Sequence, residues 1–336
     1  MKNILVTGGA GYIGSHTCLA LAQAGFNAVI VDNYSNSDPD VPERLARMAG
    51  DENMEGSIIR TGVSDIRDTR HLEFLMRKFA VTAVIHLAGL KSVGDSVANP
   101  MSYYYANVCG SISVVQAMQK AGVEDIVFSS SATVYGEPGI DSLSELLPVS
   151  YANPYAHTKI IIEQMLEQEE KANPKWRSMT LRYFNPVGAH PSGKIADRPK
   201  GKPLNLMPVI VNAAETGEPM SVFGTDYNTP DGTCIRDYIH VMDLASGHVD
   251  AVNHLLIGGG SAVINLGTGE GYSVLEVIYT FERVNGVTVP FNRVDRRPGD
   301  VPRLVANVDR AWTKLGWEAN LSLAQMCRDA WNARTL

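Results

Sequence analysis

The sequence predicts an α/β protein with a doubly wound parallel sheet, followed by a second, smaller region of mixed α/β structure. Three observations favour this fold. Short apolar runs alternate with longer amphipathic runs over residues 1–185, and strands that alternate with helices imply parallel crossovers. A glycine-rich turn joins the first apolar run to the first amphipathic run. After Asn185 the alternation gives way to a stretch rich in proline, glycine and polar residues, residues 186–203, which we expect to form a long loop.

The first elements form an anion site. Residues 3–7 are an apolar run typical of a buried strand, and residues 12–24 have helical periodicity. Between them Gly8, Gly11 and Gly14 are spaced as Gly-x-x-Gly-x-x-Gly, one residue longer than the common dinucleotide-binding fingerprint. Free N–H groups at the start of a helix attract phosphates. We therefore predict that a dinucleotide pyrophosphate binds at this turn.

Asp32 indicates which dinucleotide binds. It ends the second apolar run, residues 28–31, and lies 18 residues after Gly14. A carboxylate at the tip of this strand can accept hydrogen bonds from the adenosine ribose hydroxyls, and it would repel a 2′-phosphate. No arginine or lysine occurs at residues 33–36. The sequence therefore predicts NAD rather than NADP as the cofactor.

The remaining elements continue the alternation. We expect strands at residues 57–60, 83–87, 125–129 and 179–183, with helices at residues 69–79, 102–121 and 155–171 between them. Ligands of such sheets bind beyond the carboxyl ends of the strands. The expected organisation is a Rossmann-like NAD-binding domain over residues 1–185, with returns from about residues 237–266, and a smaller substrate-binding region over residues 186–336.

Composition excludes several classes of protein. The 336 residues are 45% hydrophobic and 19% charged, as in ordinary globular proteins. The net charge of −7, without a block of basic residues, argues against nucleic-acid binding. No apolar run approaches the roughly 18 residues of a membrane helix. The four cysteines form no Cys-x-x-Cys pair, and the eight histidines lack metal-ligand spacing. We expect no metal and no membrane partner. Because the chain enters a strand without a signal peptide, we expect a cytoplasmic location.

Three side chains predict the chemistry. The run 129–133 (Ser-Ser-Ser-Ala-Thr) follows a strand, so the Ser131 hydroxyl belongs to the carboxyl edge of the sheet. Tyr155 and Lys159 are four residues apart at the start of a helix, after Pro154, and therefore share one helix face. A nearby cation lowers a tyrosine pKa from about 10 toward neutral, and NAD⁺ adds positive charge. A phenolate beside a hydride acceptor predicts oxidation of an alcohol to a ketone.

Six motifs carry a resemblance that runs nearly from end to end of the chain. They occupy residues 6–17, 86–94, 129–136, 181–191, 236–241 and 296–300. With these motifs the chain resembles the extended short-chain dehydrogenase/reductases and, among them, the UDP-glucose (UDP-galactose) 4-epimerases. The resemblance implies NAD as a tightly held cofactor, a UDP-sugar as substrate, and a homodimer formed through the helices at residues 102–121 and 155–171.

The resemblance also implies residue roles. Tyr155 would be the acid/base, Lys159 its electrostatic partner, and Ser131 would share the proton of the sugar's 4-oxygen. The residues implied to bind NAD are Gly8, Gly11, Tyr12, Ile13, Gly14, Asp32, Asn33, Asp65, Ile66, Leu87, Ala88, Gly89, Lys91, Asn107, Ser129, Tyr155, Lys159 and Tyr183. Those implied to bind the UDP-sugar are Lys91, Ser131, Thr133, Tyr155, Phe184, Asn185, Asn205, Leu206, Phe223, Arg236, Arg297, Asp300 and Leu304.

The chain departs from the pattern of these enzymes at a few positions. Residues 62–64 (Gly-Val-Ser) precede Asp65, where glycine more often stands directly before the aspartate. Cys109 occupies a position where asparagine is usual, and Ala156 and His157 replace the small and basic residues common between Tyr155 and Lys159. None of these changes removes a reacting group.

Three functions fit a chain of this kind. The first is epimerisation, in which a 4-keto sugar forms, turns over and is reduced on its other face. The second is dehydration of the same keto sugar, which similar enzymes perform with an Asp-Glu pair where this chain has Ala132 and Thr133. The third is a non-catalytic regulator that senses NAD or a sugar nucleotide, against which the intact Ser131, Tyr155 and Lys159 argue.

Leu304 bears on the substrate. In similar epimerases a bulky tyrosine at this position favours the plain hexose, and a small residue admits an N-acetyl group. Leucine lies between these sizes, so we expect UDP-glucose and UDP-galactose as the main pair, with weak use of UDP-N-acetylhexosamines. UDP-N-acetylhexosamine or UDP-pentose 4-epimerisation is the alternative.

Overall fold

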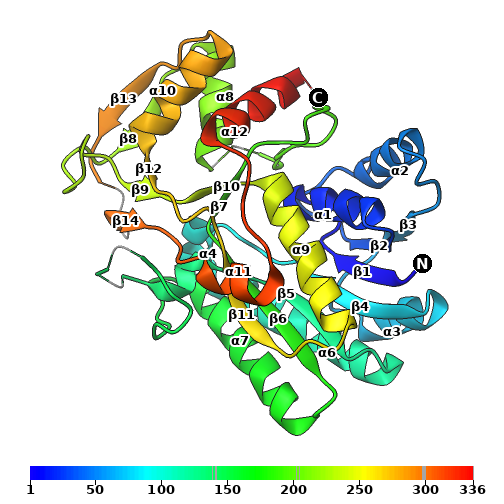
Figure 1. Ribbon diagram of the computed structural model, residues 1–336. Helices are drawn as coiled ribbons and strands as arrows, with labels where there is room; N and C mark the ends of the chain where they lie inside the picture. The colour runs from blue at the N-terminus through cyan, green and yellow to red at the C-terminus, as the bar shows by residue number, and fades with distance from the viewer. Residues whose placement is uncertain (138, 141, 202, 204, 297–299, 336) are drawn as a thin grey trace. The chain divides into compact units, whose positions relative to one another are not determined.

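The structure, a computed structural model, describes residues 1–336 except 138, 141, 202, 204, 297–299 and 336 (Figure 1). Its internal contacts divide the chain into two compact units, and neither unit is contiguous in sequence. Unit 1 comprises Met1–Gly136, Pro148–Arg182 and Ala245–Ile264. Unit 2 comprises Glu137–Leu147, Tyr183–Leu244 and Asn265–Leu336.

Unit 1 is built on a seven-stranded sheet in the order β11-β6-β5-β4-β1-β2-β3, which confirms the predicted doubly wound α/β fold. The strands are β1 Asn3–Thr7, β2 Asn27–Asp32, β3 Ile58–Val63, β4 Val81–His86, β5 Asp125–Ser131, β6 Arg177–Tyr183 and β11 Ala262–Leu266. Strand β1 pairs in parallel with both β2 and β4. The strand order reverses between β1 and β4, and such sheets bind ligands at this point, beyond the carboxyl ends of the strands.

Helices flank this sheet (Figure 1). They are α1 Tyr12–Gln23, α2 Val41–Asp51, α3 Thr69–Lys78, α4 Val93–Ala98, α5 Pro100–Tyr103, the π-helical segment η1 Tyr104–Cys109, α6 Gly110–Ala121, the short 3₁₀ turn η2 Ala132–Tyr135, α7 Pro154–Ala172 and α9 Val241–Leu256. One face of the sheet, with Leu5, Val29 and Val84, forms an apolar core with α3, α6 and α7. Burial of this surface is the main favourable contribution to the stability of the unit.

Most predicted elements lie within a few residues of the observed ones, but helices α2 and α4 and the helix expected over residues 102–121 are exceptions. The helix expected over residues 102–121 is divided, because a π-helical segment over Tyr104–Cys109 separates α5 from α6. Helix α2 was not predicted, although Leu45 and Met48 give it a buried face. The loop expected over residues 186–203 is interrupted at its start by the short strand β7, Asn185–Val187, whereas the described residues of 188–203 form no helix or strand.

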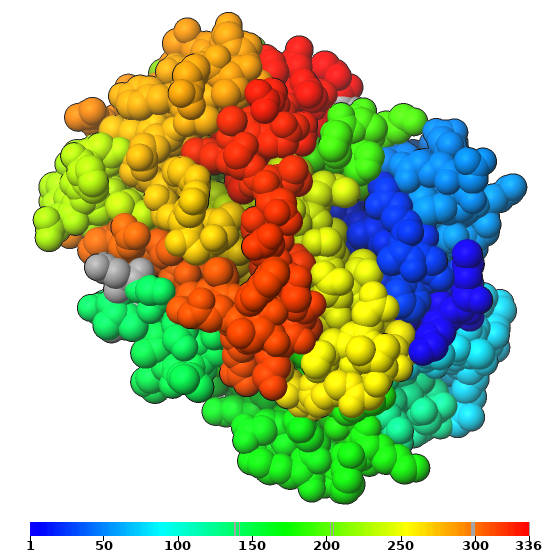
Figure 2. Space-filling view, viewed as in Figure 1, coloured from blue at the N-terminus to red at the C-terminus, as the bar shows by residue number. Residues whose placement is uncertain are grey.

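Unit 2 contains small sheets and short helices. Its strands are β7 Asn185–Val187, β8 Met220–Phe223, β9 Ile235–Arg236, β10 Tyr238–His240, β12 Tyr272–Ser273, β13 Phe291–Val294 and β14 Arg303–Leu304; its helices are α8 Leu206–Thr216, α10 Val274–Asn285, α11 Asp309–Leu315, α12 Leu323–Asn332 and the 3₁₀ turn η3 Ala333–Thr335. Helices α10 and α12 lie side by side (Figures 1 and 2), and the rings of Phe281 and Trp331 meet edge to face between them. Across the described ranges, no helix combines the length and apolar character that crossing a membrane requires.

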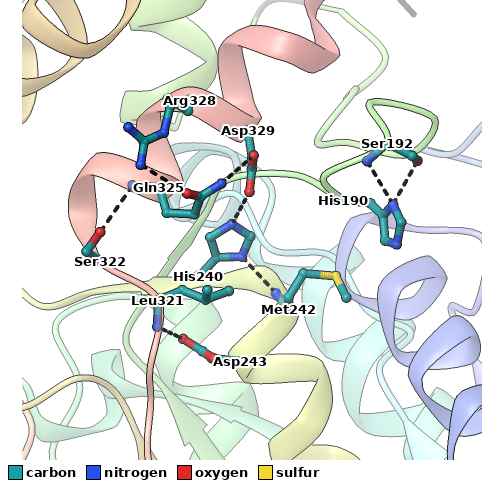
Figure 3. A network of polar contacts seen from close by, with 10 residues as sticks. All are labelled: His190, Ser192, His240, Met242, Asp243, Leu321, Ser322, Gln325, Arg328 and Asp329. Carbon is teal, nitrogen blue, oxygen red and sulfur yellow. Dashed lines mark hydrogen bonds and ion pairs between the residues drawn. The ribbon is translucent and has the colours of Figure 1, made fainter.

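A buried polar network joins β10 to α12 (Figure 3). His240 Nε2 lies 3.1 Å from Asp329 Oδ2, and His240 Nδ1 accepts a hydrogen bond from the Met242 N–H. Because Nδ1 is an acceptor, the neutral tautomer donates its Nε2 hydrogen to Asp329. The Gln325 side-chain amide donates to the other oxygen of Asp329. Burial opposes ionisation of Asp329, but these hydrogen bonds hold its pKa below the ordinary value.

Candidate active site

The glycine turn after β1 closes so tightly that side chains would not fit. A Cβ on Gly14 would lie 2.1 Å from the carbonyl oxygen of Gly8, and a Cβ on Gly8 would lie 2.9 Å from the Ala88 nitrogen. Gly8 also has φ = +69°, which favours glycine. Gly11 is the N-cap of α1, and no side chain caps that helix end. The first N–H groups of α1 are therefore presented without a side-chain acceptor, which fits the pyrophosphate of NAD.

Asp32 is buried at the end of β2. Its Oδ2 accepts a hydrogen bond from the Ala10 N–H at 3.0 Å. Its Oδ1 accepts hydrogen bonds from the Tyr34 N–H at 2.8 Å and from the Ser37 hydroxyl at 3.0 Å. Asp32 therefore fastens the glycine turn to the end of β2, a role that the sequence did not reveal. Its contact with the adenosine ribose stays a prediction.

Asp65 follows β3 and forms a bidentate ion pair with Arg67. Arg67 Nε and Nη2 lie 2.8 Å and 2.6 Å from its two oxygens, and the Asn33 side chain donates a further hydrogen bond at 3.3 Å. Hydrogen bonding by Arg67 is the main cause that holds the pKa of Asp65 well below its usual range. The adjacent Ile66 packs on α6 at Gly110, where a Cβ would lie 2.5 Å from Ile66 Cδ1. Arg67 was not predicted as part of this group.

Asn107 connects the loop after β4 to helix α7. It is buried in the π-helical segment η1. Its Oδ1 accepts a hydrogen bond from the Leu90 N–H at 2.8 Å, and its Nδ2 donates to the Leu90 carbonyl and to Thr158 Oγ1, both at 3.0 Å. Thr158 in turn donates to the carbonyl of Tyr155 at 2.7 Å. A Cβ on Gly89 would lie 3.1 Å from Asn107 Oδ1, so the loop passes closely over the amide.

The three predicted catalytic residues come together in unit 1. Ser131 ends β5, and Tyr155 and Lys159 lie one turn apart on α7. Lys159 Nζ donates a hydrogen bond to the Ser129 carbonyl at 2.6 Å and lies 5.8 Å from the centre of the Tyr155 ring. Ser131 Oγ accepts hydrogen bonds from the N–H and the hydroxyl of Thr133, at 3.2 and 3.0 Å. The side chains of Ser131 and Tyr155 also form a hydrogen bond with each other.

The electrostatics of this group differ from the expectation. Burial raises the pKa of Tyr155, and the hydrogen bond with Ser131 offsets part of that rise. In the chain without NAD, burial therefore outweighs the expected lowering of this pKa, because it penalises the phenolate. Burial lowers the pKa of Lys159 to about 8, while Glu163 acts in the opposite direction. Lys159 thus remains mainly protonated at neutral pH.

The other predicted residues of unit 1 lie around the same strand ends. Tyr12 and Ile13 begin α1, and Leu87, Ala88 and Lys91 follow β4 in the loop that Asn107 holds. The glycine turn follows β1, Asp32 ends β2, and Asp65 follows β3. These predicted NAD-binding residues therefore lie at the ends of the four strands β1 to β4. The carboxyl edge of the sheet is therefore where the structure gathers them, as the alternation of strands and helices predicted.

In unit 2, Arg236, Asp300 and Leu304 are brought together by two short paired strands. Arg236 lies on β9 opposite Leu304 on β14. Its Nη1 donates hydrogen bonds to the carbonyls of Ile235 and Val301, both at 2.8 Å, and its Nη2 lies 3.5 Å from Asp300 Oδ1. A guanidinium fixed in this way still has donors suited to paired phosphate oxygens.

Asp237 holds the surroundings of Arg236 in place. Its fully buried carboxylate accepts hydrogen bonds from the N–H and hydroxyl of Thr268, both at 2.8 Å, from the Gly269 N–H at 3.0 Å and from the Ala306 N–H at 3.1 Å. Burial raises the pKa of Asp237, and these donors offset part of the rise. The turn at residues 267–269 and the chain after β14 are therefore fastened to one side chain.

The remaining predicted residues of unit 2 are more scattered. Tyr183 ends β6, Phe184 follows it and is buried, Asn185 begins β7, Asn205 is the N-cap of α8, Leu206 begins α8, and Phe223 ends β8. Arg297 lies outside the described residues. The structure therefore joins Arg236, Asp300 and Leu304 directly, and places the others at the ends of strands and helices.

One charged group beside the catalytic residues was not predicted from the sequence. Glu163 on α7 pairs with Arg182 on β6 and accepts a hydrogen bond from the Ser130 hydroxyl. The available signal was spacing, because Glu163 follows Lys159 by the same four residues that separate Lys159 from Tyr155. Arg182 is part of the 181–191 motif, but no partner for it was predicted.

Comparison with known proteins gives concordant results. A family model described as the NAD dependent epimerase/dehydratase family matches residues 4–267. A UDP-glucose 4-epimerase of Bacillus subtilis is 47% identical over 329 residues, which make up 98% of this chain and 95% of that protein. The solved structure of a UDP-glucose-4-epimerase from Stenotrophomonas maltophila, with bound NAD and formylated UDP-arabinopyranose, is 46% identical with a TM-score of 0.96, and the match covers 100% of this chain and 98% of that one. A UDP-glucose 4-epimerase from Bifidobacterium longum in complex with NAD⁺ and UDP is 43% identical with a TM-score of 0.93, over 99% of this chain and 98% of that one.

These matches confirm the resemblance on which the sequence analysis relied. The family model spans most of the chain, and the relatives match it nearly from end to end. The solved structures share its doubly wound sheet, and dependence on NAD characterises the family, so the predicted cofactor is confirmed as well. The chain belongs to the NAD dependent epimerase/dehydratase family.

Proposed function

We propose that this protein catalyses the NAD-dependent epimerisation of a UDP-hexose at carbon 4, with UDP-glucose and UDP-galactose as the principal pair. The observation that carries the proposal is the grouping of Ser131, Tyr155 and Lys159 at the sheet edge that also bears the glycine turn. The names of the relatives, which are similar over nearly the whole chain, support the same reaction.

Tyr155 is the proposed acid/base. It takes the proton of the sugar's 4-hydroxyl. NAD, when bound, would supply the acceptor, and later the donor, of the hydride at carbon 4. Ser131 donates its hydrogen to the phenolic oxygen and so stabilises the phenolate as it forms. Lys159, held by the Ser129 carbonyl, contributes a positive charge beside the ring. Tyr155 then gives the proton back when the 4-keto sugar is reduced on its other face, so no net redox change occurs.

Residues 1–185, with returns from about residues 237–266, are the proposed NAD-binding domain, and residues 186–336 are the proposed binding region for the UDP-sugar. Arg236 and Arg297 clamp the pyrophosphate, and Asp300 binds the uridine ribose. Anchoring the substrate only through UDP leaves the sugar free to turn over between the two transfers. Arg236→Ala should then raise KM for the UDP-sugar while the NAD content of the purified protein stays unchanged.

The alternatives make different predictions. A dehydratase would need acid and base groups at Ala132 and Thr133, and neither side chain is a carboxylic acid. A regulator would bind the sugar nucleotide without converting it. The deciding experiment incubates the purified protein with UDP-galactose and no added cofactor, and then separates the sugar nucleotides. UDP-glucose is the expected product; a 4-keto-6-deoxy sugar, or no conversion, contradicts the proposal.

The matched variant is Tyr155→Phe, which removes the phenol and keeps the ring. General acid–base catalysis is worth about 10²–10⁴-fold, so kcat should fall by at least that factor. Substrate binding should be largely kept. Near-normal turnover in this variant would show that another group is the base.

We also infer a homodimer. Exposed apolar side chains occur on successive helices of unit 1, namely Val97 on α4, Met101 on α5, Tyr105 on η1 and Ile112 on α6. Apolar side chains gathered in this way are typical of interfaces. Sedimentation should give the mass of two chains, and Met101→Glu with Ile112→Glu should reduce it to one. A cytoplasmic location is inferred as well, and the four free cysteines suit a reducing compartment.

A further inference from the structure

The largely buried carboxylate of Glu163 lies one helical turn beyond Lys159, on the face of α7 that carries the catalytic pair. Tyr155, Lys159 and Glu163 recur at intervals of four residues, which places them in one row. Arg182 Nη2 lies 2.7 Å from Glu163 Oε2, and Arg182 Nε lies 3.1 Å from Oε1. The Ser130 hydroxyl also donates to Oε1. Glu163 therefore fastens α7 to both β5 and β6.

The Glu163–Arg182 pair is removed from water. The two side chains are 10% and 5% exposed, and the Arg182 guanidinium lies 4.9 Å from the centre of the Tyr135 ring. Desolvating two charges is costly, and replacing such a pair by apolar residues is often neutral for stability. A buried pair next to a catalytic lysine therefore calls for an explanation beyond stability.

Charge supplies that explanation. The negative charge of Glu163 stabilises the protonated forms of both Lys159 and Arg182. Burial lowers the pKa of Lys159 to about 8, and Glu163 opposes this. Arginine cannot lose its proton in a protein, whereas lysine can. If the carboxylate were neutral, Lys159 would be the group that loses its charge.

The other titratable groups that face this cluster carry no charge at neutral pH. His86 on β4 is buried between Thr7 and Ser111, and burial, followed by Lys159, lowers its pKa to about 3. The Tyr135 ring lies against the Arg182 guanidinium, and Tyr103 acts on Tyr155; burial raises the pKa of Tyr103, so that phenol is uncharged at neutral pH. Among the described residues that act on Lys159 and its row, Glu163 and Arg182 are therefore the charged partners.

We propose that Glu163 is a positioning residue that keeps Lys159 protonated beside Tyr155, and that Arg182 limits how strongly it does so. This inference rests on the proposed epimerase function. It gives the two members of one ion pair opposite effects on the reaction, which a purely structural pair would not have.

The test measures kcat and KM of the holoenzyme for UDP-galactose between about pH 6 and 10. In Glu163→Gln the amide keeps the size of the side chain and can still accept from Arg182, but the charge is gone. Lys159 then faces a buried cation and loses its proton at lower pH. The alkaline limb of the kcat profile should move to lower pH, with about a tenfold loss of kcat on that side for each unit of displacement. KM should change little.

Arg182→Gln should displace the alkaline limb of the kcat profile in the opposite direction. Among the described residues it leaves Lys159 as the cation that Glu163 acts on, so the alkaline limb should move to higher pH. The double variant Glu163→Gln/Arg182→Gln removes both charges and should return the limb toward that of the wild type. Glu163→Asp, which keeps the charge, should rescue the profile in part. Glu167→Gln is the matched control, because Glu167 lies one turn further along α7, is exposed and pairs only with Lys171 among the contacts of the described residues.

The outcomes separate the inference from the function on which it rests. Shifts of opposite sign in the two single variants, with normal NAD content and circular dichroism, support the inference. Lower activity with an unshifted profile, or shifts in the same direction, would overturn it and leave a structural role for the pair. If Glu163→Gln does not fold, Arg182→Gln and Glu163→Asp still decide the sign. A wild-type protein that does not convert UDP-galactose would instead overturn the proposed function, and the inference with it.

Discussion

Asp237 offers a direct test of how unit 2 is held together. The perturbation is Asp237→Asn, which keeps the shape of the side chain and exchanges one acceptor oxygen for an NH₂ group. All four partners of the carboxylate are donors in the structure, three of them backbone N–H groups. An amide cannot accept from all of them, so at least one buried donor must lose its acceptor.

The magnitude follows from the geometry. The best orientation points the NH₂ group toward Thr268, whose hydroxyl can turn and accept. The Thr268 N–H is then left without an acceptor, which costs about 1–3 kcal/mol. The hydrogen bonds from Gly269 and Ala306 persist but lose the assistance of a charged acceptor, worth about 1 kcal/mol each. Relief from burying a charge offsets part of this. The expected loss in the free energy of unfolding is about 2–4 kcal/mol.

Urea denaturation followed by tryptophan fluorescence measures this loss, because Trp317 is buried in unit 2. Asp309→Asn is the control: the chemical change is the same, but Asp309 is exposed, and the effect should stay within about 0.5 kcal/mol. If Asp237→Asn is as stable as the wild type, the carboxylate does not hold the turn at residues 267–269. KM for the UDP-sugar should also rise, since Arg236 directly precedes Asp237 in the chain.

Three further predictions follow from the same structure. Lys159→Ala should move the acid limb of the kcat profile to higher pH, because Tyr155 loses the cation that favours its phenolate; an unmoved limb would exclude Lys159 as that cation. Leu304→Tyr should raise the ratio of kcat/KM for UDP-galactose over UDP-N-acetylgalactosamine, and an unchanged ratio would mean that this side chain does not gate the substrate. His240→Phe should destabilise the fold by about 2–4 kcal/mol in denaturant, because buried Asp329 loses its main donor. Since the pKa of Asp329 is held low in the folded state, the stability it provides is present above about pH 4 and lost below it, so this difference between variant and wild type should shrink in acid.

The sequence predicted the parts of the site that depend on local order. The glycine turn, Asp32 and the pair of Tyr155 and Lys159 each lie within a single strand–turn–helix segment or one helix, where spacing alone decides what shares a face. The carboxyl edge of the sheet then gathers these segments, because parallel strands end on the same side. These residues could therefore be predicted without knowledge of tertiary contacts.

The remainder depends on contacts that spacing does not encode. Asp237 accepts hydrogen bonds from residues 31 and 69 positions away, and Glu163 on helix α7 pairs with Arg182 on strand β6. Asn107 lies in a π-helical segment, whose hydrogen bonds span one residue more than those of an α-helix. The pattern of apolar residues is matched to the α-helical period, so it predicts a single unbroken α-helix there. The pKa of Tyr155 was misjudged for a related reason: the charge of Lys159 can be read from the sequence, but the depth of burial cannot.

The contact between His240 and Asp329 has a consequence for how the chain is made. It joins residues that are 89 positions apart. At about 5–20 residues per second, a ribosome adds the second partner roughly 4–18 s after the first. Throughout that interval α12 is absent, so the imidazole and the apolar side chains around β10 stay uncovered. The chain between the two residues also has not yet lost the conformational entropy that closing so long a loop requires. Unit 2 therefore completes its folding late in synthesis. Holdase chaperones should bind the nascent chain between these two residues.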